Sequence, residues 1–465
     1  MDRATRDQSS ALFAAATDPA RMRAILEQHL RVPGGRPVEV VQCGVSFARG
    51  RGPRSLFQYD VRLRDPVAGR EWNQVVSGVA YGGQRTRKAW EKLKFADDQI
   101  DRQPVLCRAA YVPDLDLLLQ VFPFDHELPA LEPLMAGTLA DLHGPILARF
   151  GPGNWRLDEW QAESVRYRVD LRASVKLTVR ASQPASGFAM ERRFFAKVYG
   201  GGHRVERAWT IQREVADALA AASEPVGLAP IVAYLADDRV LVQDEVQATS
   251  LSEILHGAVP DRAAEAVRRA ARAIATLHSL RLAAPEHRFE LERTDPGRLR
   301  RSTDALCRAR PDLAAAVIEV EAGIMTGLDA IGELAPVPVH GDLKPAHLLL
   351  NEERVVLLDL DKFAAGEPML DVTNMLVPLR RERKTRTAGT SLARVFAEEY
   401  FAHVPAAWEQ RLIPHYAWAI LKEASGFATG PAQVPAEARP SRRERRKNHV
   451  DLLLDEARAL LAGRT

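Results

Sequence analysis

The sequence is poor in cysteine, in net charge and in long apolar runs. Its 465 residues contain three widely spaced cysteines, Cys43, Cys107 and Cys307, without a CxxC pair, so neither a disulfide framework nor a zinc site is indicated. The formal net charge of +3 is too small to favour a nucleic-acid binder. The first stretch, MDRATRDQSSALFAAATDPARMRAILEQHL, has charges among its apolar residues and lacks the roughly 20 apolar residues of a membrane span. We therefore expect a cytoplasmic protein that binds neither nucleic acid nor membranes.

The composition is that of an ordinary globular protein, 46% hydrophobic and 27% charged, with enough length for two or three domains. Residues 1–34 have the pattern of a helical segment closed by the helix-stop signal PGG. Short β-type runs such as LFQYDVRL and NQVVSGVAY follow, up to about residue 140. Helical patterns dominate after Leu251, in DRAAEAVRRAARAIATLHSL, PDLAAAVIEVEAGIM, SLARVFAEEYFAHV, YAWAILKEASGF and HVDLLLDEARALLAG. Strands followed by helices predict an α+β fold.

Two strand-rich stretches of the chain are similar to each other. RSLFQYDVRL, which starts at Arg54, aligns with RASVKLTVRA, which starts at Arg172, and the same gap-free alignment places Tyr81 on Tyr199. One inserted residue later, KAW matches RAW. Chance similarity between β-rich stretches is the alternative, but an aromatic residue, two glycines and a tryptophan in the same order favour duplication. We therefore expect two copies of one strand-rich module.

The second copy contains a candidate ion pair. RRFFAKVYG is a strand-like run that places Lys197 among apolar residues. Glu214 follows in a segment of helical composition and shares a face with Ile211, so it faces packed surface. Lys197 and Glu214 are candidates for the pair that positions ATP phosphates, with Glu206 as a weaker partner. The alternative is a strand-edge lysine whose charged end stays in water.

A strand and a helix meet at a second candidate site. RVLVQDEVQATSLSEILHG combines a buried-looking strand with a helix that Ser250 and Glu253 open as a capping box. The strand ends at Asp244, Glu245 and Val246, whose backbone groups could pair with an adenine edge. Any linker between two domains would give a similar pattern.

A hairpin in the C-terminal half gathers polar side chains. LLL, ending at Leu350, and VVLLDLD, starting at Val355, are apolar strands joined by the four-residue turn NEER. Closing the turn brings the residues before the first strand beside the end of the second strand. Asp342, Lys344 and His347 are therefore expected to lie near Asp359 and Asp361. Residues i and i+2 of a strand point the same way, so Asp359 and Asp361 are expected to share a face. Carboxylates that converge from two segments require a cation, a proton or a lysine.

HGDLKPAHLLL, VVLLDLD and GEPMLDVTNML together resemble the aminoglycoside phosphotransferase family, over roughly residues 166–377. The resemblance implies a two-lobed, protein-kinase-like fold, with ATP and Mg²⁺ or Mn²⁺ as cofactors. By the resemblance, Asp342 is the catalytic aspartate, Lys344 lies near the transferring phosphate and Asp359 is the main metal ligand. Asp371, together with His340, would brace the catalytic loop.

Two departures from the family pattern bear on this resemblance. Residues 166–175, which should cover the phosphates, contain no glycine, so the phosphate grip would rest on side chains such as Arg168 or Arg172. His347 stands where the family places the second metal ligand, although imidazole suits manganese, zinc or iron better than magnesium. Asp361 could supply the missing oxygen, His347 could bind a softer ion or a phosphate, or the site could be inactive. If His347 titrates near 6.5, activity should change steeply between pH 6 and 7.

The first copy lacks the corresponding charges, because the alignment places Val79 on Lys197 and Phe95 on Glu214. It is therefore expected to be a degenerate duplicate of the nucleotide lobe. Two hypotheses for its role are that it covers the substrate side or that it mediates homodimerisation. In either case its deletion is expected to leave nucleotide binding unchanged.

We divide the chain into a helical segment (1–34), a degenerate nucleotide-lobe-like domain (35–140), a kinase-like N-lobe (141–247) and a helical C-lobe with the catalytic hairpin (248–465). The expected function is ATP-dependent transfer of a γ-phosphoryl group to a small-molecule hydroxyl. The alternatives are a nucleotide-binding pseudokinase that acts as a scaffold, and an interaction module without nucleotide. The basic runs LRRERKTR (379–386) and SRRERRKNH (441–449) could attract an acidic acceptor, but their usual meaning is a solvated helix face or loop.

Overall fold

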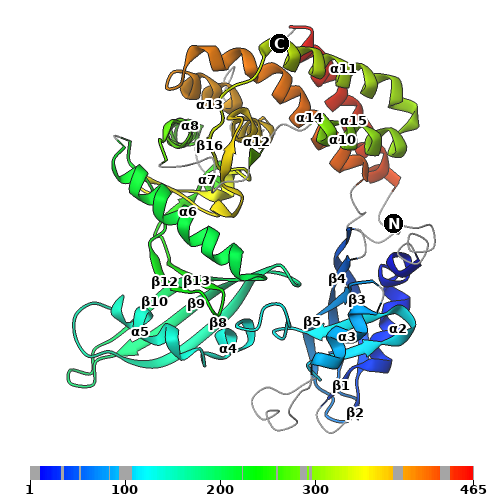
Figure 1. Ribbon diagram of the computed structural model, residues 1–465, viewed down its shortest axis with the longest axis vertical. Coiled ribbons are helices and arrows are strands. Elements are labelled where there is room, and N and C mark those ends of the chain that lie inside the picture. Colours follow the sequence, from blue (N-terminus) through cyan, green and yellow to red (C-terminus); the bar gives the residue numbers. More distant parts are fainter. Residues whose placement is uncertain are drawn as a thin grey trace. The chain divides into compact units, whose positions relative to one another are not determined.

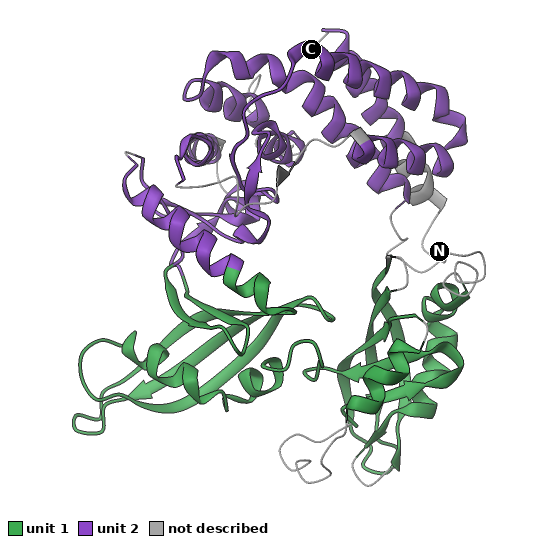
Figure 2. Cartoon of the chain, viewed as in Figure 1, with its two compact units in different colours: residues 1–206, 230–245 green, residues 207–229, 246–465 purple. Residues whose placement is uncertain are grey.

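A computed structural model describes residues 11–32, 36–51, 54–82, 84–93, 107–222, 224–257, 260–282, 291–292, 296–380, 391–429 and 440–463. The chain forms two compact units, shown in different colours in Figure 2. Unit 1 comprises residues 1–206 and 230–245, and unit 2 comprises residues 207–229 and 246–465. Phe95 and the greater part of both basic runs lie outside the described residues or their described side chains.

The first module of unit 1 is a five-stranded antiparallel sheet in the order β3-β4-β5-β7-β6 (Figure 1). Its strands are β3 (Glu39–Arg51), β4 (Arg54–Arg64), β5 (Glu71–Ala80), β6 (Ala109–Val112) and β7 (Leu117–Val121), with the helix α3 (Arg85–Lys92). The predicted N-terminal helix is α2 (Pro19–His29), which Asp18 caps. Met22 and Leu26 of α2 are buried in the same core as Tyr59 and Val61, so this helix is part of the first module.

The second module of unit 1 is another five-stranded antiparallel sheet, in the order β8-β9-β10-β13-β12. Its strands are β8 (Arg156–Arg168), β9 (Arg172–Ser182), β10 (Ala189–Tyr199), β12 (Ile231–Leu235) and β13 (Val240–Asp244). The short helices α4 (Leu131–Ala136) and α5 (His143–Ala148) come between the two modules in the chain. The helix α6 (Gly202–Ala220) starts in unit 1 and continues into unit 2.

The two sheets have the same strand order and matching register. In each, three successive strands are followed by a helix, and the fifth strand in the chain lies between the third and the fourth. Ser55 pairs with Ala80 in the first sheet, and the gap-free sequence alignment carries this pair onto Ala173 and Val198, which pair in the second sheet.

The two sheets also share a β-bulge and a tight turn. The same alignment carries Leu63, beside the first bulge between β3 and β4, onto Ala181, beside the first bulge between β8 and β9. In both sheets a non-glycine residue with positive φ occupies the turn between the last two strands, Asp116 (φ 46°) in one and Arg239 (φ 58°) in the other. These features extend the sequence similarity to the backbone.

Unit 2 consists mainly of helices around two small sheets, one in the order β11-β18-β17-β14 and one in the order β15-β19-β16. Its helices are α7 (Leu251–Gly257), α8 (Pro260–Ser279), α10 (Pro296–Ala309), α11 (Ala314–Ile331), α12 (Met369–Leu379), α13 (Leu392–Phe401), α14 (Leu412–Thr429) and α15 (Pro440–Leu461). Its strands are β11 (Val226–Leu228), β14 (Thr249–Ser250), β15 (Leu291–Glu292), β16 (Val337–Val339), β17 (Leu348–Leu350), β18 (Val355–Leu357) and β19 (Ala364–Gly366). The five helical patterns predicted after Leu251 correspond to α8, α11, α13, α14 and α15.

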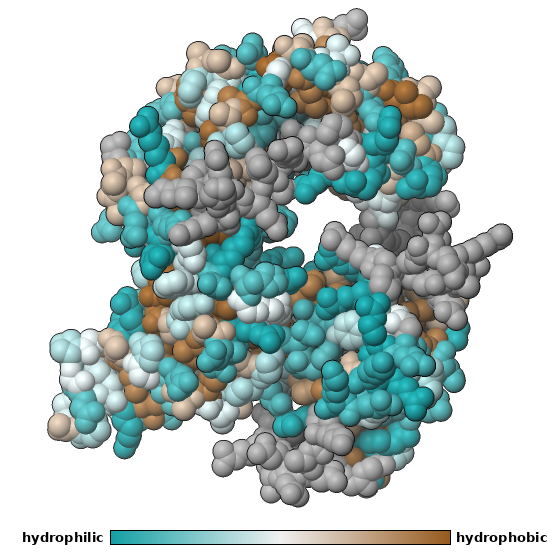
Figure 3. Space-filling model, viewed as in Figure 1, coloured by the Kyte–Doolittle hydropathy of each residue, from teal (hydrophilic) through white to brown (hydrophobic). Residues whose placement is uncertain are grey.

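The α+β expectation is confirmed, and so is the capping box at the start of α7. The Ser250 amide donates to Glu253 Oε2 at 3.1 Å, and the Glu253 amide donates to Ser250 Oγ at 3.2 Å. The face shown in Figure 3 is mainly hydrophilic, with scattered apolar residues. Within the described part of the chain, no helix combines the length and the hydropathy that crossing a membrane requires.

Candidate active site

The predicted hairpin forms as β17 and β18, which pair antiparallel from Leu348–Leu357 to Leu350–Val355. Asn351 closes the turn because its side-chain oxygen accepts from the amides of Glu353 (3.1 Å) and Arg354 (2.9 Å). The hairpin places the loop before β17 next to the segment after β18, since the Leu358 amide donates to the carbonyl of His347 at 2.9 Å. The residues before and after the hairpin therefore lie side by side.

A buried carboxylate holds the loop before the hairpin. Asp371, on α12, is fully buried and accepts from the amide of His340 at 2.6 Å and the amide of Gly341 at 3.0 Å. The His278 ring lies 3.2 Å from the same carboxylate and 2.7 Å from the hydroxyl of Tyr400. Two amide donors and an imidazole thus satisfy a charge that would be costly to bury alone.

Asp342 is half-buried, and Lys362 donates to its Oδ1 at 2.9 Å. Burial by itself would raise the pKa of Asp342, but the hydrogen bond and charge of Lys362, together with the charges of Lys344 and His347, lower that pKa below its usual value. The carboxylate is therefore ionised at neutral pH. The approach of the two segments requires Gly341, whose φ is 75° and where a Cβ would lie 2.3 Å from the carbonyl oxygen of Lys362.

The expectation that Asp359 and Asp361 share a strand face is wrong. The strand β18 ends at Leu357, Asp359 is left-handed (φ 61°), and Asp361 lies in the 3₁₀ turn Leu360–Lys362. The alternation of side chains along a strand does not extend through a left-handed residue. Arg207 holds this turn by donating to the carbonyls of Asp361 (3.1 Å) and Phe363 (2.8 Å).

His347 lies between the two segments. It is buried, its ring stacks on His340 with 5.4 Å between centroids, and its Nε2 is 3.7 Å from Asp359 Oδ2. Its Nδ1 is buried without a hydrogen-bond partner. Burial, followed by the charges of Lys344 and His340, lowers the pKa of His347 to about 4. The condition for a steep change of activity between pH 6 and 7 is therefore not met, because the imidazole is neutral throughout that range.

The carboxylates whose charges act on His347 are those of Asp359 and Asp342. Within the described part of the chain, one group of three residues has ligand atoms close enough to hold a metal ion, within 4.8 Å of one another. This group is Asp125, His126 and Asp170 in unit 1, so it does not include His347. In unit 2 the carboxylate of Asp359 lies 3.7 Å from His347 Nε2. Magnesium commonly takes one or two carboxylates and completes its coordination with phosphates and water. Asp359 fits that mode, whereas the nitrogen of His347 suits a softer ion.

The expected nucleotide-binding residues are divided between the units. Lys197 is half-buried on β10 and pairs in register with Ser174 and Leu241. Glu214 is half-buried on the part of α6 that belongs to unit 2. The pairing of Lys197 with Glu214 stays a prediction. Arg172 starts β9, and its contribution to phosphate binding also stays a prediction.

Two of the three residues expected to meet adenine have their amides engaged within the protein. The Asp244 amide donates to the carbonyl of Pro230 at 3.0 Å, and the Glu245 amide donates to the carbonyl of Arg193 at 3.1 Å. The Asp244 side chain is ion-paired with Arg149. The amides of Asp244 and Glu245 are therefore not available as donors to an adenine, because they already donate to the carbonyls of Pro230 and of Arg193 on β10. A role for Val246 stays a prediction.

Sequence reasoning missed Lys362, Arg207 and His278. Lys362 directly follows the Asp-Leu-Asp run, so its position next to a carboxylate cluster was a usable signal. Arg207 and His278 contact residues far along the chain, and no local pattern marks them.

The model of the Phosphotransferase enzyme family matches residues 187–412, which include the hairpin and Asp371. A search of curated proteins found no match. Among solved structures, an ADP-bound aminoglycoside phosphotransferase is 13% identical, with 70% of this chain and 99% of that chain covered and a TM-score of 0.41. A choline/ethanolamine kinase family protein from Mesorhizobium loti is 16% identical, with 70% and 95% covered and a TM-score of 0.42.

An ethanolamine kinase from Plasmodium vivax is 11% identical, with 83% of this chain and 98% of that chain covered and a TM-score of 0.43. The family expectation drawn from the hairpin is confirmed by the sequence match: residues 187–412 are similar to the phosphotransferase enzyme family.

Proposed function

We propose that the chain transfers the γ-phosphoryl group of ATP to a hydroxyl of a small molecule, with a divalent metal ion. The observation that carries the proposal is the ionised Asp342, held beside a hairpin whose other end presents Asp359. The match of residues 187–412 to the phosphotransferase family supports the same reaction class. Phosphoryl transfer requires little covalent chemistry from a protein, so positioning and charge neutralisation are what these residues would supply.

In this proposal Asp342 orients the acceptor hydroxyl and accepts its proton. A carboxylate with a lowered pKa is a weak base, so its main contribution is to hold the hydroxyl in line with the phosphate. Lys362 and Lys344 would supply positive charge beside the transferring phosphate. Lys362 now pairs with Asp342 and is largely exposed, so it can move from the carboxylate to a phosphate oxygen when ATP binds.

Asp359 would hold a magnesium or manganese ion, which neutralises phosphate charge when bound. His347 is neutral at physiological pH, so its Nε2 can coordinate manganese or donate to a phosphate oxygen. Asp371 would act as the brace of the loop, through the amides of His340 and Gly341.

We also propose that the first module is a duplicate of the second. The common strand order, the register pairs and the paired positions of the first bulge support this origin. The alignment places Val79 on Lys197, so the first module has no lysine at this position to bind a phosphate. Val79 is fully buried.

The test is ADP release from ATP over a panel of sugars, amino alcohols and antibiotics, with Mg²⁺ or Mn²⁺. We expect at least one acceptor class to stimulate ADP release, and Asp342→Asn to reduce the rate by roughly 10²-fold or more. ATP binding without turnover by any acceptor would favour the pseudokinase alternative. If millimolar ATP does not raise the melting temperature, the chain is an interaction module.

A further inference from the structure

The two middle residues of the turn between β8 and β9 (168–171), Val169 and Asp170, are buried within unit 1. In the resemblance to phosphotransferases this is the segment expected to cover the nucleotide phosphates. Val169 is fully buried, and it shares a core with Leu56 and Val79 of the first module. Asp170 has φ 59°, and its side chain is fully buried. The β8–β9 turn does not depend on glycine for its conformation, because its packing against the first module fixes it.

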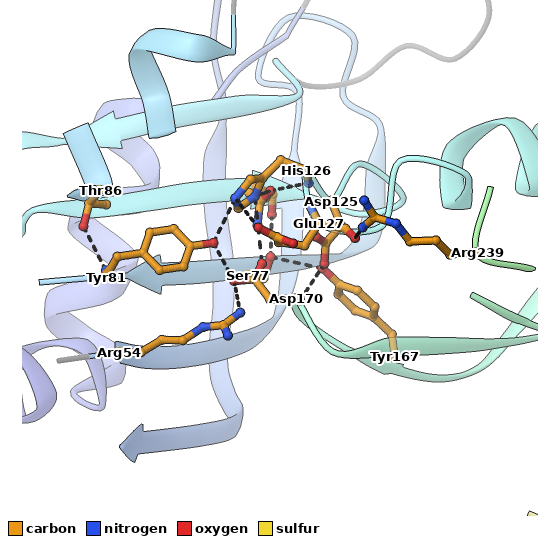
Figure 4. Close-up of polar contacts among 11 residues, drawn as sticks. Arg54, Ser77, Tyr81, Thr86, Asp125, His126, Glu127, Tyr167, Asp170 and Arg239 are labelled. Carbon is orange, nitrogen blue, oxygen red and sulfur yellow. Dashed lines mark hydrogen bonds and ion pairs between the residues drawn. The ribbon is translucent and has the colours of Figure 1, made fainter. Parts of the chain in front are cut away.

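Polar contacts from the first module hold this turn (Figure 4). Asp170 Oδ2 accepts from Arg54 and from the hydroxyl of Tyr81, both at 2.7 Å. The Asp170 amide donates to Asp125 Oδ2 at 2.9 Å. Tyr167, at the end of β8, donates to the same oxygen of Asp125 at 2.8 Å. We call Arg54, Tyr81, Asp125, Tyr167 and Asp170 the junction network.

Two further residues, His126 and Arg168, extend the junction network. The His126 Nε2 lies 2.8 Å from the hydroxyl of Tyr81, and its Nδ1 lies 2.8 Å from Gln120 Oε1. The guanidinium of Arg168 lies over the ring of Phe47, 4.7 Å from its centroid, and donates to Gln58 Oε1 at 3.4 Å. Arg168, one of the side chains expected to grip phosphate, is thus engaged with the first module instead.

Asp125, His126 and Asp170 also have ligand atoms within 4.8 Å of one another, which is a geometry that metal ions use. Three of the four carboxylate oxygens of Asp125 and Asp170, however, already accept from N–H or O–H donors. The fourth, Asp170 Oδ1, has no hydrogen-bond partner and lies 3.9 Å from His126 Nδ1. Arg54 supplies positive charge directly to Asp170. The hydrogen bonds of the cluster therefore join the β8–β9 turn to the first module, and the carboxylates are used for these bonds rather than for binding a metal ion.

We propose that Tyr81, Arg54 and Asp125 are positioning residues for phosphoryl transfer, which hold the β8–β9 turn and thereby place the start of β9, where Arg172 is expected to meet the ATP phosphates. The proposal rests on the proposed function. It assigns the first module a role in nucleotide binding, and it replaces the sequence-based expectation that deletion of this module leaves nucleotide binding unchanged. The first module, which has no phosphate-binding lysine, would thus influence ATP binding by holding the β8–β9 turn in place.

The test compares Tyr81→Phe with Tyr111→Phe. Both variants lose a tyrosine hydroxyl that donates to an aspartate of unit 1, at 2.7 Å to Asp170 and at 2.8 Å to Asp116, respectively. Only the first of these contacts reaches the β8–β9 turn. Hydrogen exchange of residues 166–175 and the KM values for ATP and for the acceptor are measured for both variants and for the wild-type chain.

We expect Tyr81→Phe to speed amide exchange of the turn and to raise the KM for ATP, each by roughly tenfold, while the KM for the acceptor stays unchanged. Tyr111→Phe should behave as wild type in all three measurements. Asp170→Asn keeps the side-chain shape but also removes the charge that pairs with Arg54, so its effects should be at least as large as those of Tyr81→Phe. The double variant should show less than the sum of the two effects because both changes affect the same contact.

Equal exchange rates and equal KM values for Tyr81→Phe and Tyr111→Phe would overturn the proposal. Faster exchange with an unchanged KM for ATP would also overturn it, because the network would then be structural only. A wild-type chain that does not bind ATP would instead refute the proposed function, and that outcome is read from the wild-type protein alone.

Discussion

At the residue scale, His347 is the main difference between the catalytic loop of this chain and the family pattern. Its ring is buried, stacked on His340 and 3.7 Å from Asp359. Because burial lowers its pKa to about 4, its protonation does not change at neutral pH. A metal ion bound at Asp359 would lower that pKa further, since it adds positive charge.

This predicts that the activity ratio of wild type to His347→Gln is constant from pH 6 to pH 8. The wild-type imidazole and the amide are both uncharged over that range, so they respond alike. The measurement is kcat against pH for both proteins with the same metal ion. A ratio that changes more than about threefold between pH 6 and pH 7 would mean that His347 titrates near its ordinary value.

At the scale of the element, the hairpin β17–β18 brings Asp342 and Lys362 together because the segments before β17 and after β18 approach closely. Gly341 is the point of contact, with a positive φ and the carbonyl of Lys362 where a Cβ would lie. Gly426, in α14 of the same unit, is exposed and has open space around its Cβ position. The two glycines therefore form a matched pair for alanine substitution.

We expect Gly341→Ala to destabilise unit 2 by more than about 1 kcal/mol and to abolish activity, because the contact of Asp342 with Lys362 must shift. Gly426→Ala should stabilise its helix by about 0.5–1 kcal/mol and leave activity unchanged. Denaturant unfolding and ADP release report the two effects. Normal activity in Gly341→Ala would show that the loop can form without this close approach.

Prediction from sequence succeeded where local patterns carry the information. The helices of unit 2 follow from their apolar periodicity, and the hairpin follows from two apolar runs around NEER. It failed at Asp361, because nothing local indicates that Asp359 adopts a left-handed conformation that ends the strand. It also missed the junction network, since Arg54 and Asp170 meet only through tertiary structure.

At the scale of the whole molecule, the junction network links pH to the stability of unit 1. Burial, and then the charge of Asp170, raise the pKa of Asp125 to about 7, against an ordinary value of 3.8. Between these values the folded state binds more protons than the unfolded state, so stability falls as pH rises from about 4 to about 7. The other ionisable groups at this junction include Arg54, Tyr81, His126, Glu127, Tyr167, Arg168 and Asp170.

We therefore predict that Asp125→Asn, whose side chain does not titrate, loses part of this pH dependence. Melting temperatures of the wild type and the variant are compared at pH 5 and pH 8 in matched ionic strength. The difference between the two pH values should be smaller for the variant than for the wild type. A variant with the same pH dependence as wild type would show that Asp125 is ionised in the folded protein over this whole range.

The central claim is that Asp359 holds the metal ion while Asp342 serves the chemical step. Calorimetric titration with ATP, with and without Mg²⁺ or Mn²⁺, tests it in wild type, Asp342→Asn and Asp359→Asn. We predict that Asp342→Asn keeps metal-dependent ATP binding close to that of the wild type, while Asp359→Asn binds ATP with the same weak affinity whether or not metal is present. Metal-dependent binding of equal strength in Asp359→Asn and the wild type would contradict the claim.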